Sequence, residues 1–489
     1  MPEETTAPAK PSAVEKPEAA AEPVRYDYDL IVIGSGPAGQ RAAIQAAKLG
    51  KRVAVIERKA VVGGVSVNLG TIPSKTLREA VLYLSGYRER NLYGTSYTVK
   101  EKITIEDLLF RAQHVIRSEI DIVRSQLRRN NINLIAADAR FQNPHTVHLN
   151  FVDSHSEETI SGEKIIIATG SSATRVPGIP FDGQRILTSD DILHLDTIPR
   201  TMTIIGGGVI GCEYACMFAT LGVRVTLVDK GERLLTFIDQ EIIESLVYHL
   251  RQQRATVWLG EGVDHLEPVD DERGQRVRIT LESGKQIITE KALYSIGRTG
   301  ATEGLNLKAV GLKADKRGRL AVNKHYQTTV PHVYAVGDVI GFPSLASTSM
   351  EQGRLAACHA FQHGANSVPE LSPFGIYTIP EISICGRSEQ ELTEQGVPYE
   401  IGKAYYRETA RGQIIGDEIG MLKLIYHLET HKLLGVHIIG YGAAELIHIG
   451  QAVLAFGGTI EYFINNVFNY PTLAEAYKNA AFDAVNRQA

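Results

Sequence analysis

Residues 29–57 read DLIVIGSGPAGQRAAIQAAKLGKRVAVIE, and this stretch decides the fold of the first part of the chain. The apolar run at 29–33 predicts a buried strand, the residues up to Leu49 have a helical period, and residues 53–56 predict a second strand. A glycine motif, GxGxxG, lies between the first strand and the helix. The stretch therefore predicts a strand–helix–strand unit with a tight glycine turn after its first strand.

Each glycine of this turn has a physical role in holding a pyrophosphate. Gly34 makes the tight turn, Gly36 lets the backbone approach the phosphates, and Gly39 lets the helix and the strand pack closely. The N-terminus of the helix then faces the negative charge. Glu57 follows Gly34 by 23 residues and can accept hydrogen bonds from ribose hydroxyls. The unit is predicted to bind a dinucleotide.

The same pattern recurs later in the chain. Residues 202–215 read MTIIGGGVIGCEYA, with Gly206, Gly208 and Gly211 in the glycine motif. A predicted strand at 223–228 ends at Asp229, again 23 residues after the first glycine. One GxGxxG is a weak signal, but two copies with matching strands, helices and acids are a strong one. A second dinucleotide unit is therefore predicted.

Two apolar segments surround the second unit and predict further buried strands. Residues 164–170 (KIIIATG) end at Thr169 and Gly170, and residues 333–338 (VYAVGD) end at Gly337 and Asp338. Asp338 can cap a helix, bind a ligand at the carboxyl end of a strand, or do both. The second unit thus looks inserted into the first. From about residue 366 the pattern becomes that of a separate α+β domain without a glycine motif.

The predicted architecture is therefore α/β, with two Rossmann-like units and a C-terminal α+β domain. The predicted boundaries are a disordered tail at 1–24, the first unit at 25–196, the second at 197–300, the rest of the first at 301–365, and the last domain at 366–489. The tail contains glutamates and has no apolar core, so we read it as neither a signal peptide nor a transit peptide.

Composition excludes several other classes of protein. A net charge of −5 lacks the excess of basic residues that is typical of nucleic-acid binding. No apolar run approaches the ~20 residues that span a bilayer. Four cysteines in a long chain suit a reducing cytoplasm. Cys212 and Cys216 share a helix face and are interpreted as packing thiols, with a redox or metal pair as the alternative. No histidine pattern predicts a metal site.

Residues 63–75 read GGVSVNLGTIPSK and resemble the redox-active segment GGxCxxxGCxPSK of the flavoprotein disulfide reductases. In that family the two cysteines form a disulfide beside a flavin. Here Ser66 and Thr71 stand in the cysteine positions, and a hydroxyl cannot relay electrons as a dithiol does. Pro73 and Ser74 can start a helix that carries Lys75.

The chain as a whole, from Tyr26 to about Arg487, resembles the flavoproteins with two dinucleotide-binding domains that include lipoamide dehydrogenase and glutathione reductase. Its longest matching stretches resemble the pyridine nucleotide transhydrogenases within that family. They are GTIPSKTLREA (70–80), GVIGCEYA (208–215), YAVGDVIGFPSLAS (334–347), IYTIPEIS (376–383), IHIGQA (447–452) and FNYPTLAEAY (468–477). The resemblance implies a C-terminal dimerisation domain and a homodimer or higher homo-oligomer.

The resemblance also implies FAD in the first unit and NAD(H) or NADP(H) in the second. Glu57 would contact the adenosine ribose of FAD and Asp338 its ribityl chain, and Lys75 would lie beside the flavin N5, paired with Glu213. Further contacts to FAD are implied for Gly63, Gly64, Ser66, Thr71, Thr169, Gly170 and Gly337. Contacts to the nicotinamide nucleotides are implied for Gly206, Gly208, Gly211, Asp229, Lys230, Arg233, Gly297 and Arg298.

A second departure from the disulfide reductases lies near the C-terminus. Their His-Pro-Thr…Glu segment supplies the general base of the thiol step, whereas here Tyr470 replaces the histidine and Glu475 keeps the acid. A tyrosine, with a reference pKa of ~10, is a poor base at neutral pH. The resemblance sends this segment into the active site of the partner subunit. The thiols and their base are thus absent together.

The preferred interpretation is hydride transfer between NADPH and NAD⁺ through FAD, with both nucleotides visiting one nicotinamide site in turn and without a redox disulfide. One alternative is a flavin NAD(P)H oxidase or diaphorase with another acceptor. Another is a non-catalytic flavin or nucleotide sensor. For Lys75 and Glu213 the alternative is a salt bridge that only ties the two units together, and for Lys230 and Arg233 it is ordinary surface charge.

Overall fold

The computed structural model describes residues 25–154, 156–272, 274–365 and 371–487, so the predicted tail lies outside the described residues. Its first sheet belongs to the first predicted unit. The strands are β1 (Tyr28–Ile33), β2 (Val53–Glu57), β3 (Asn133–Asn143), β4 (Thr146–Phe151), β5 (Glu157–Ile167) and β16 (Val333–Ala335). β1 pairs in parallel with β2 and β5, and β16 pairs in parallel with β5. Because β5 and β16 flank the second unit in sequence, their pairing confirms that this unit is inserted in the first.

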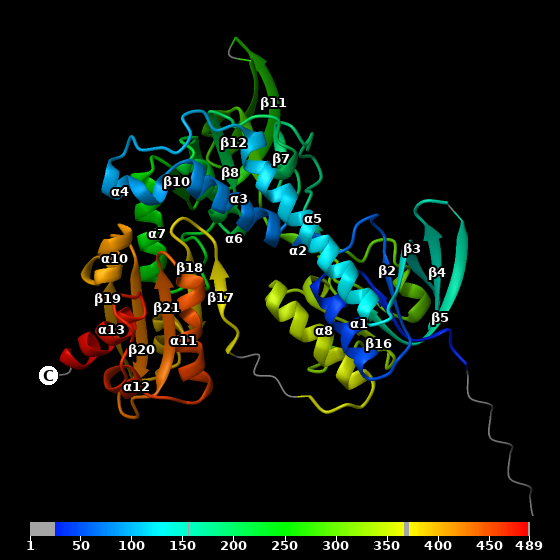
Figure 1. Cartoon of the computed structure of the whole chain (residues 1–489). Helices are drawn as coiled ribbons and strands as arrows, with labels where there is room; N and C mark the ends of the chain where they lie inside the picture. Colours follow the sequence, from blue (N-terminus) through cyan, green and yellow to red (C-terminus); the bar gives the residue numbers. More distant parts are fainter. Residues whose placement is uncertain (1–24, 155, 273, 366–370, 488–489) are drawn as a thin grey trace, which may run out of the picture.

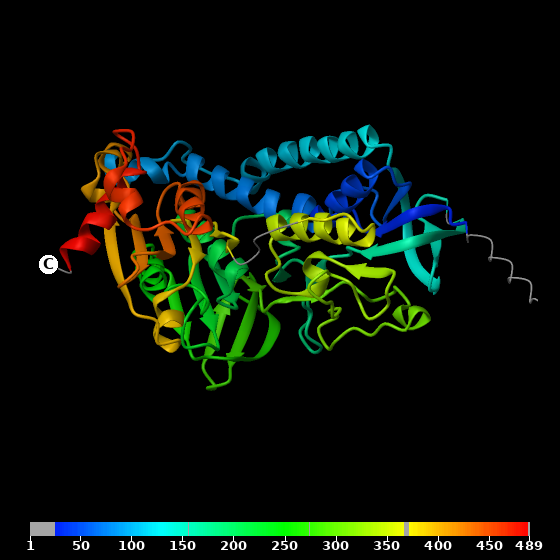
Figure 2. The same cartoon turned by 90° about the horizontal axis from the view of Figure 1, so that it is seen from below.

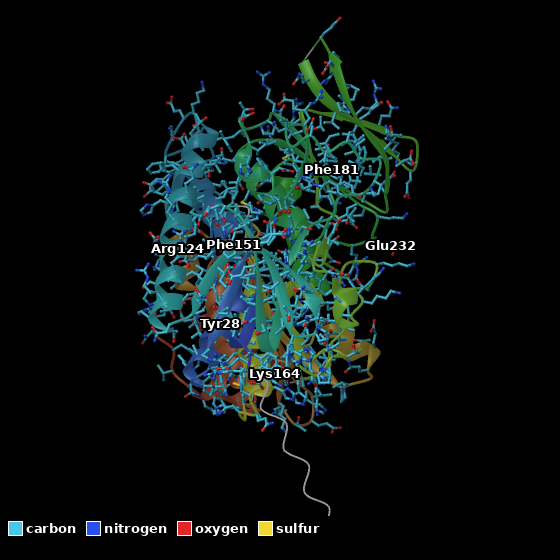
Figure 3. The ribbon with its side chains drawn as sticks, turned by 90° about the vertical axis from the view of Figure 1, so that its right-hand side faces the viewer. Tyr28, Arg124, Phe151, Lys164, Phe181 and Glu232 are labelled. Carbon is cyan, nitrogen blue, oxygen red and sulfur yellow. The ribbon has the colours of Figure 1, made fainter. Side chains whose placement is uncertain are left out.

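Alternation along β1 decides what covers each face of this sheet. Leu30 and Val32 pack toward the helices α1 (Pro37–Lys48), α5 (Ile105–Arg129) and α8 (Ala346–Ala360). Ile31 and Ile33 point to the other face, where the β3–β4 hairpin and residues near 305–320 cover them. The outer face of α5 is solvated: Arg124 is exposed and lies at the edge of the molecule in Figure 3.

The second unit contains a parallel sheet in the order β10-β9-β8-β14-β7. Its strands are β7 (Ile186–Thr188), β8 (Thr201–Ile205), β9 (Arg224–Asp229), β10 (Thr256–Leu259) and β14 (Lys291–Tyr294), with helices α6 (Val209–Thr220) and α7 (Gln240–Gln252). An antiparallel sheet of β11 (Val263–Asp271), β12 (Gly274–Leu281) and β13 (Gln286–Thr289) is attached. Because β7 belongs to this sheet, the second unit includes residues that precede the start predicted at residue 197.

The C-terminal region folds as the predicted α+β domain around an antiparallel sheet in the order β17-β18-β21-β20-β19. The strands are β17 (Phe374–Ile376), β18 (Ile382–Gly386), β19 (Tyr399–Tyr405), β20 (Met421–His427) and β21 (Leu433–Ile439). Its helices are α9 (Glu389–Glu394), α10 (Ala410–Ile415), α11 (Ala443–Ala455), α12 (Glu461–Asn465) and α13 (Glu475–Asn486). Apolar side chains of β20, β21, α11 and α13 form its core.

The remaining elements lie within these units or between them. They are α2 (Gly64–Asn68), α3 (Thr71–Leu84), α4 (Arg90–Tyr93), the antiparallel pair β6 (Ser171–Ala173) and β15 (Arg298–Gly300), and the 3₁₀ helices η1 (Tyr87–Glu89), η2 (Ile192–His194), η3 (Leu307–Val310), η4 (Gly337–Ile340) and η6 (Tyr406–Glu408). The helix start predicted at Pro73 is wrong by two residues, because α3 begins at Thr71. Proline lacks only an N–H that the first helical turn leaves unpaired, so Pro73 fits inside that turn.

The two ends of the molecule are bridged on one side by long helices. Figure 1 shows the C-terminal domain, with β19, β20 and α13, at the opposite end from α1, α8 and β16. In Figure 2, α3 and α5 run along one side of the molecule and pack against each other. Each helix in the described part of the chain is too short or too polar to cross a membrane. The N-terminal end of α3 lies where the first and second units meet, because Lys75 on its second turn pairs with Glu213 of the second unit.

Candidate active site

The first glycine turn has the close contacts that its motif requires. Gly34 has φ +107°, and a Cβ there would lie 2.4 Å from the carbonyl oxygen of Ala168. A Cβ on Gly39 would lie 2.0 Å from the oxygen of Gly34. Gly36 is the N-cap of α1, has no side-chain cap and has open space around it. The first amides of α1 are therefore available to a phosphate.

Glu57, at the end of β2, is held by the turn that it faces. Ser35 donates to Oε2 of Glu57 from its backbone nitrogen at 3.1 Å and from its hydroxyl at 2.6 Å. The backbone nitrogen of Lys59 donates to Oε1 at 3.0 Å, and the Ser35 hydroxyl also accepts from the nitrogen of Gly63 at 3.0 Å. The buried carboxylate is therefore fixed in orientation, with lone pairs left for ribose hydroxyls. Ser35 occupies a variable position of the motif, so the motif does not predict its role.

The second glycine turn repeats this geometry. Gly206 has φ +107°, and a Cβ on Gly211 would lie 1.9 Å from the oxygen of Gly206. Gly208 is the uncapped N-cap of α6. Asp229, at the end of β9, accepts from the backbone nitrogen of Gly207 at 2.5 Å and from that of Gly231 at 2.6 Å. Both units thus orient the acid of the second strand through backbone amides.

A single cavity of about 1170 Å³ reaches both turns. Most of the predicted site residues line it. They are Gly34, Gly36, Glu57, Gly64, Ser66, Thr71, Lys75, Thr169, Gly170, Gly208, Glu213, Gly297, Arg298, Gly337 and Asp338. The other predicted residues are outside its lining: Gly39 and Gly211 lie in the first turns of α1 and α6, Gly63 precedes α2, Gly206 lies in the second glycine turn, and Asp229, Lys230, Arg233, Tyr470 and Glu475 lie elsewhere.

An ion pair joins the two units at this cavity. Nζ of Lys75, on α3, donates to Oε1 and Oε2 of Glu213, on α6, at 2.8 and 2.7 Å. Glu213 is 4% exposed, and the side chain of Lys75 is 27% exposed. The backbone nitrogen of Tyr377 donates to Oε1 of Glu213 at 2.9 Å. Tyr377 lies within IYTIPEIS, but no motif in that stretch predicts its contact.

The residues expected beside FAD offer unused polar groups, and they fit that cofactor. Oγ1 of Thr169 is buried in the cavity wall and has no hydrogen-bond partner among the described residues. Asp338 lies within η4, where it caps nothing, and its Oδ2 accepts from the Ser171 hydroxyl at 2.7 Å. Arg298 donates to the same hydroxyl at 2.9 Å. These groups, with the open amides of α1, suit a diphosphate and the hydroxyls of a ribityl chain.

The cavity contains no thiol within its described lining. Ser66 on α2 and Thr71 at the start of α3 both line it. All four cysteines are buried and unpaired elsewhere. Burial raises the pKa of Cys216 to about 12 and raises the pKa of Cys212 well above its usual range. These thiols remain protonated and serve as packing groups, as the sequence predicts.

Three of the predicted residues outside the lining, Lys230, Arg233 and Tyr470, have other neighbours or lie exposed, and Glu475 is half-buried. Lys230 forms an exposed ion pair with Glu282 at 2.9 Å, and Arg233 donates to Gln240 at 3.0 Å. Tyr470 is 73% exposed. Oε2 of Glu475 is buried and has no hydrogen-bond partner within the described chain.

One acidic cluster in the described residues has the spacing of metal ligands: Asp239, Glu241 and Glu389. The fully buried ammonium of Lys423 forms ion pairs with all three, at 3.0 Å to Asp239 and 3.1 Å to Glu241. The ammonium supplies the positive charge among the carboxylates. The cluster therefore links the second unit to the C-terminal domain as an ion-pair network.

Comparison with known proteins agrees with this geometry. The family model described as pyridine nucleotide-disulphide oxidoreductase matches residues 28–353, and the model for the dimerisation domain of the same family matches residues 372–481. The chain belongs to this family. FAD is the cofactor of the family, and the dimerisation domain indicates a homo-oligomer.

Two relatives within the family match almost the whole chain. The soluble pyridine nucleotide transhydrogenase of Mycobacterium tuberculosis (strain ATCC 25177 / H37Ra) is 54% identical over 461 residues, which are 94% of this chain and 98% of that protein. The soluble pyridine nucleotide transhydrogenase of Serratia proteamaculans (strain 568) is 46% identical over 466 residues, 94% of this chain and 99% of that protein.

Two solved structures of family members share the fold. LpdA from Mycobacterium tuberculosis has a TM-score of 0.84 at 25% identity, covering 94% of this chain and 99% of its own. The HOCl-induced flavoprotein disulfide reductase RclA from Escherichia coli has a TM-score of 0.81 at 28% identity, covering 93% and 99%. The family is named for a disulfide, but this chain has Ser66 and Thr71 in the two positions where the cysteines of that disulfide are expected.

Proposed function

We propose that this protein transfers hydride between NADPH and NAD⁺ with bound FAD and without a redox disulfide. The observation that carries the proposal is the bridge between Lys75 and Glu213, which joins the two dinucleotide units at one shared cavity. The names of the two relatives above support the same activity. Ser66 and Thr71 support the absence of a dithiol step, because neither hydroxyl can store electrons.

The residues of the cavity divide into those that hold cofactor and those that act at the reacting atoms. Glu57, Thr169 and Asp338 would hold the ribose, diphosphate and ribityl parts of FAD. When bound, FAD supplies the group that takes hydride from one nicotinamide and gives it to another. Lys75 would place a positive charge beside the reacting ring, in a site where water screens charge less. Glu213 keeps that charge in place from the nucleotide side.

One nicotinamide site requires the two nucleotides to bind in turn. The second glycine turn is a single copy, so NADP⁺ has to leave before NAD⁺ enters. We infer that Gly206, Gly208 and Gly211 shape the pyrophosphate site, that Asp229 accepts from the ribose of NAD(H), and that Gly297 and Arg298 border the nicotinamide end. Lys230 and Arg233 follow Asp229 closely in sequence, and their long side chains can turn toward a 2′-phosphate.

The C-terminal domain would form a homodimer in which Tyr470 and Glu475 complete the partner's cavity. Its surface supports this: Phe456, Val467 and Tyr470 are 91%, 93% and 73% exposed. Large apolar side chains that gather on one domain are typical of a protein interface. We infer a cytoplasmic location from the unpaired cysteines.

The test mixes the purified protein with NADPH and a thio-analogue of NAD⁺, and follows the absorbance of each nucleotide with and without oxygen. Reduction of the analogue at the same rate in both conditions is the expected result. Oxygen uptake without reduction of the analogue would identify an oxidase. If neither reaction occurs, the protein is a sensor. Both of these outcomes would refute the proposal.

A further inference from the structure

Three separate segments meet at the ammonium of Lys75. α3 carries the lysine, α6 carries Glu213, and the connection that follows β17 in the C-terminal domain carries Tyr377. Nζ of Lys75 lies 4.9 Å from the centroid of the Tyr377 ring. We propose that Tyr377 is a positioning residue whose aromatic ring fixes the Lys75 ammonium for hydride transfer, and this inference rests on the function proposed above.

The segment that carries Tyr377 is anchored on both sides of the ion pair. Its backbone nitrogen donates to Oε1 of Glu213 at 2.9 Å, on α6. The carbonyl of the next residue, Thr378, accepts from Nε of Arg78 at 2.9 Å, and Arg78 lies one helical turn after Lys75 on α3. Arg78 is 5% exposed and also pairs with Glu381 at 3.2 Å. Tyr377 is therefore fixed against both helices that supply the ion pair.

The ring provides what the ion pair alone lacks. Lys75 retains 27% exposure of its side chain, and an ion pair with that access to water holds a flexible lysine weakly. The face of an aromatic ring attracts an ammonium without carrying a charge. Burial, with the Glu381, Glu445 and Glu213 carboxylates as smaller causes, raises the pKa of the Tyr377 hydroxyl. The side chain therefore stays neutral, and Glu213 remains the countercharge of Lys75.

A cation held in this way affects both directions of the reaction alike. Lys75 lies in the wall of the cavity, so its charge is the same whichever nicotinamide nucleotide is bound. Loss of the ring should therefore slow hydride transfer from NADPH and from NADH by the same factor. A residue that recognised one nucleotide would instead change the ratio between them.

The experiment compares Tyr377→Leu and Tyr377→Phe in the FAD-loaded protein. The first readout is the rate at which acetic anhydride labels Lys75, followed by mass spectrometry of the peptide. The ring lies against the Lys75 amine and restricts access to it, so Tyr377→Leu should label about threefold to tenfold faster. Tyr377→Phe keeps the ring and should restore slow labelling. The second readout is stopped-flow reduction by NADPH and by NADH, which the Leu variant should slow by about the same factor.

A matched control removes a similar contact elsewhere. Nζ of Lys51 lies 4.9 Å from the ring of Phe361, outside the lining of the cavity. Phe361→Leu should speed the labelling of Lys51 and leave the labelling of Lys75 as it is in the native protein. A response of Lys75 to this control would overturn the proposal.

Three results for Tyr377→Leu would also overturn it. The first is that Lys75 is labelled at the native rate. The second is loss of FAD or of folded protein, which would make the ring a packing element. The third is a rate of flavin reduction that falls with one nucleotide only. If the native protein fails to reduce the thio-analogue of NAD⁺, the proposed function falls. The labelling of Lys75 then still decides whether the ring holds the ammonium.

Discussion

Replacing Lys75 by methionine tests the role of the charge at the centre of the cavity. The substitution keeps the length of the side chain and removes the ammonium that donates to both oxygens of Glu213. Glu213 is almost fully buried and keeps the backbone nitrogen of Tyr377 as a donor. Loss of one partner of a buried pair costs ~3–5 kcal/mol of stability. The partial exposure of Lys75 reduces that cost here to roughly 1–2 kcal/mol.

The effect on chemistry follows from the same charge. A unit charge acting over ~4 Å at an effective dielectric constant of ~20 contributes ~4 kcal/mol. Glu213 cancels part of it, so we expect a loss of about 2 kcal/mol. That energy lowers the two-electron potential of the flavin by roughly 45 mV and slows its reduction about 30-fold. Glu213→Gln is the matched variant, because it keeps the cation, removes the countercharge and should raise the potential.

The assay combines a spectroscopic measurement of the flavin potential with anaerobic stopped-flow reduction by NADPH. Lys75→Met should retain FAD, have a lower potential and react more slowly. If the variant instead loses FAD or stability while its remaining flavin is reduced at the native rate, the bridge only ties the two units together. The reasoning about its charge would then be wrong.

Four further outcomes are expected. Purified protein should be yellow with noncovalent FAD, and Asp338→Ala should release FAD at lower urea concentrations; a folded, colourless preparation that added FAD leaves unchanged contradicts this. Lipoamide and oxidised glutathione should not be turned over in a standard reductase assay, because Ser66 and Thr71 cannot relay electrons, and robust turnover would overturn that inference. Asp229→Ala should raise the Kd of NADH about tenfold and that of NADPH less, measured by fluorescence titration, whereas an equal effect removes the assignment. Sedimentation at assay concentration should find at least a dimer that Tyr470→Ala leaves assembled but less active, and a fully active monomer would exclude the shared site.

The glycine turns and the strand-end acids could be predicted from the sequence because their requirements are local. Gly34 and Gly206 need a positive φ, and Gly39 and Gly211 need space beside a carbonyl oxygen; both constraints leave a fixed spacing in the chain. The insertion of the second unit, which the pairing of β5 with β16 confirms, was also accessible, since each strand is an apolar run followed by a glycine and one polar residue.

Contacts between distant segments leave no fixed spacing of residues in the sequence, unlike the glycine turns. Tyr377 meets Lys75 across about 300 positions of sequence, and Arg78 reaches the carbonyl of Thr378 over the same separation. Both depend on how the C-terminal domain packs on α3, which local periodicity does not encode. The start of α3 was misplaced for a related reason: proline is tolerated throughout the first helical turn, so Pro73 does not mark the first residue.

The central claim is that electrons enter and leave this protein through FAD alone, by way of one nicotinamide site. An anaerobic reductive titration measures it directly, with NADPH added in steps to the FAD-loaded protein and NAD⁺ added at the end. We expect complete flavin reduction by about one equivalent of NADPH per FAD, followed by complete reoxidation when NAD⁺ is added in excess. Consumption of about two equivalents per FAD would reveal a second electron store such as a disulfide. A flavin that stays reduced in the presence of NAD⁺ would contradict the transfer itself.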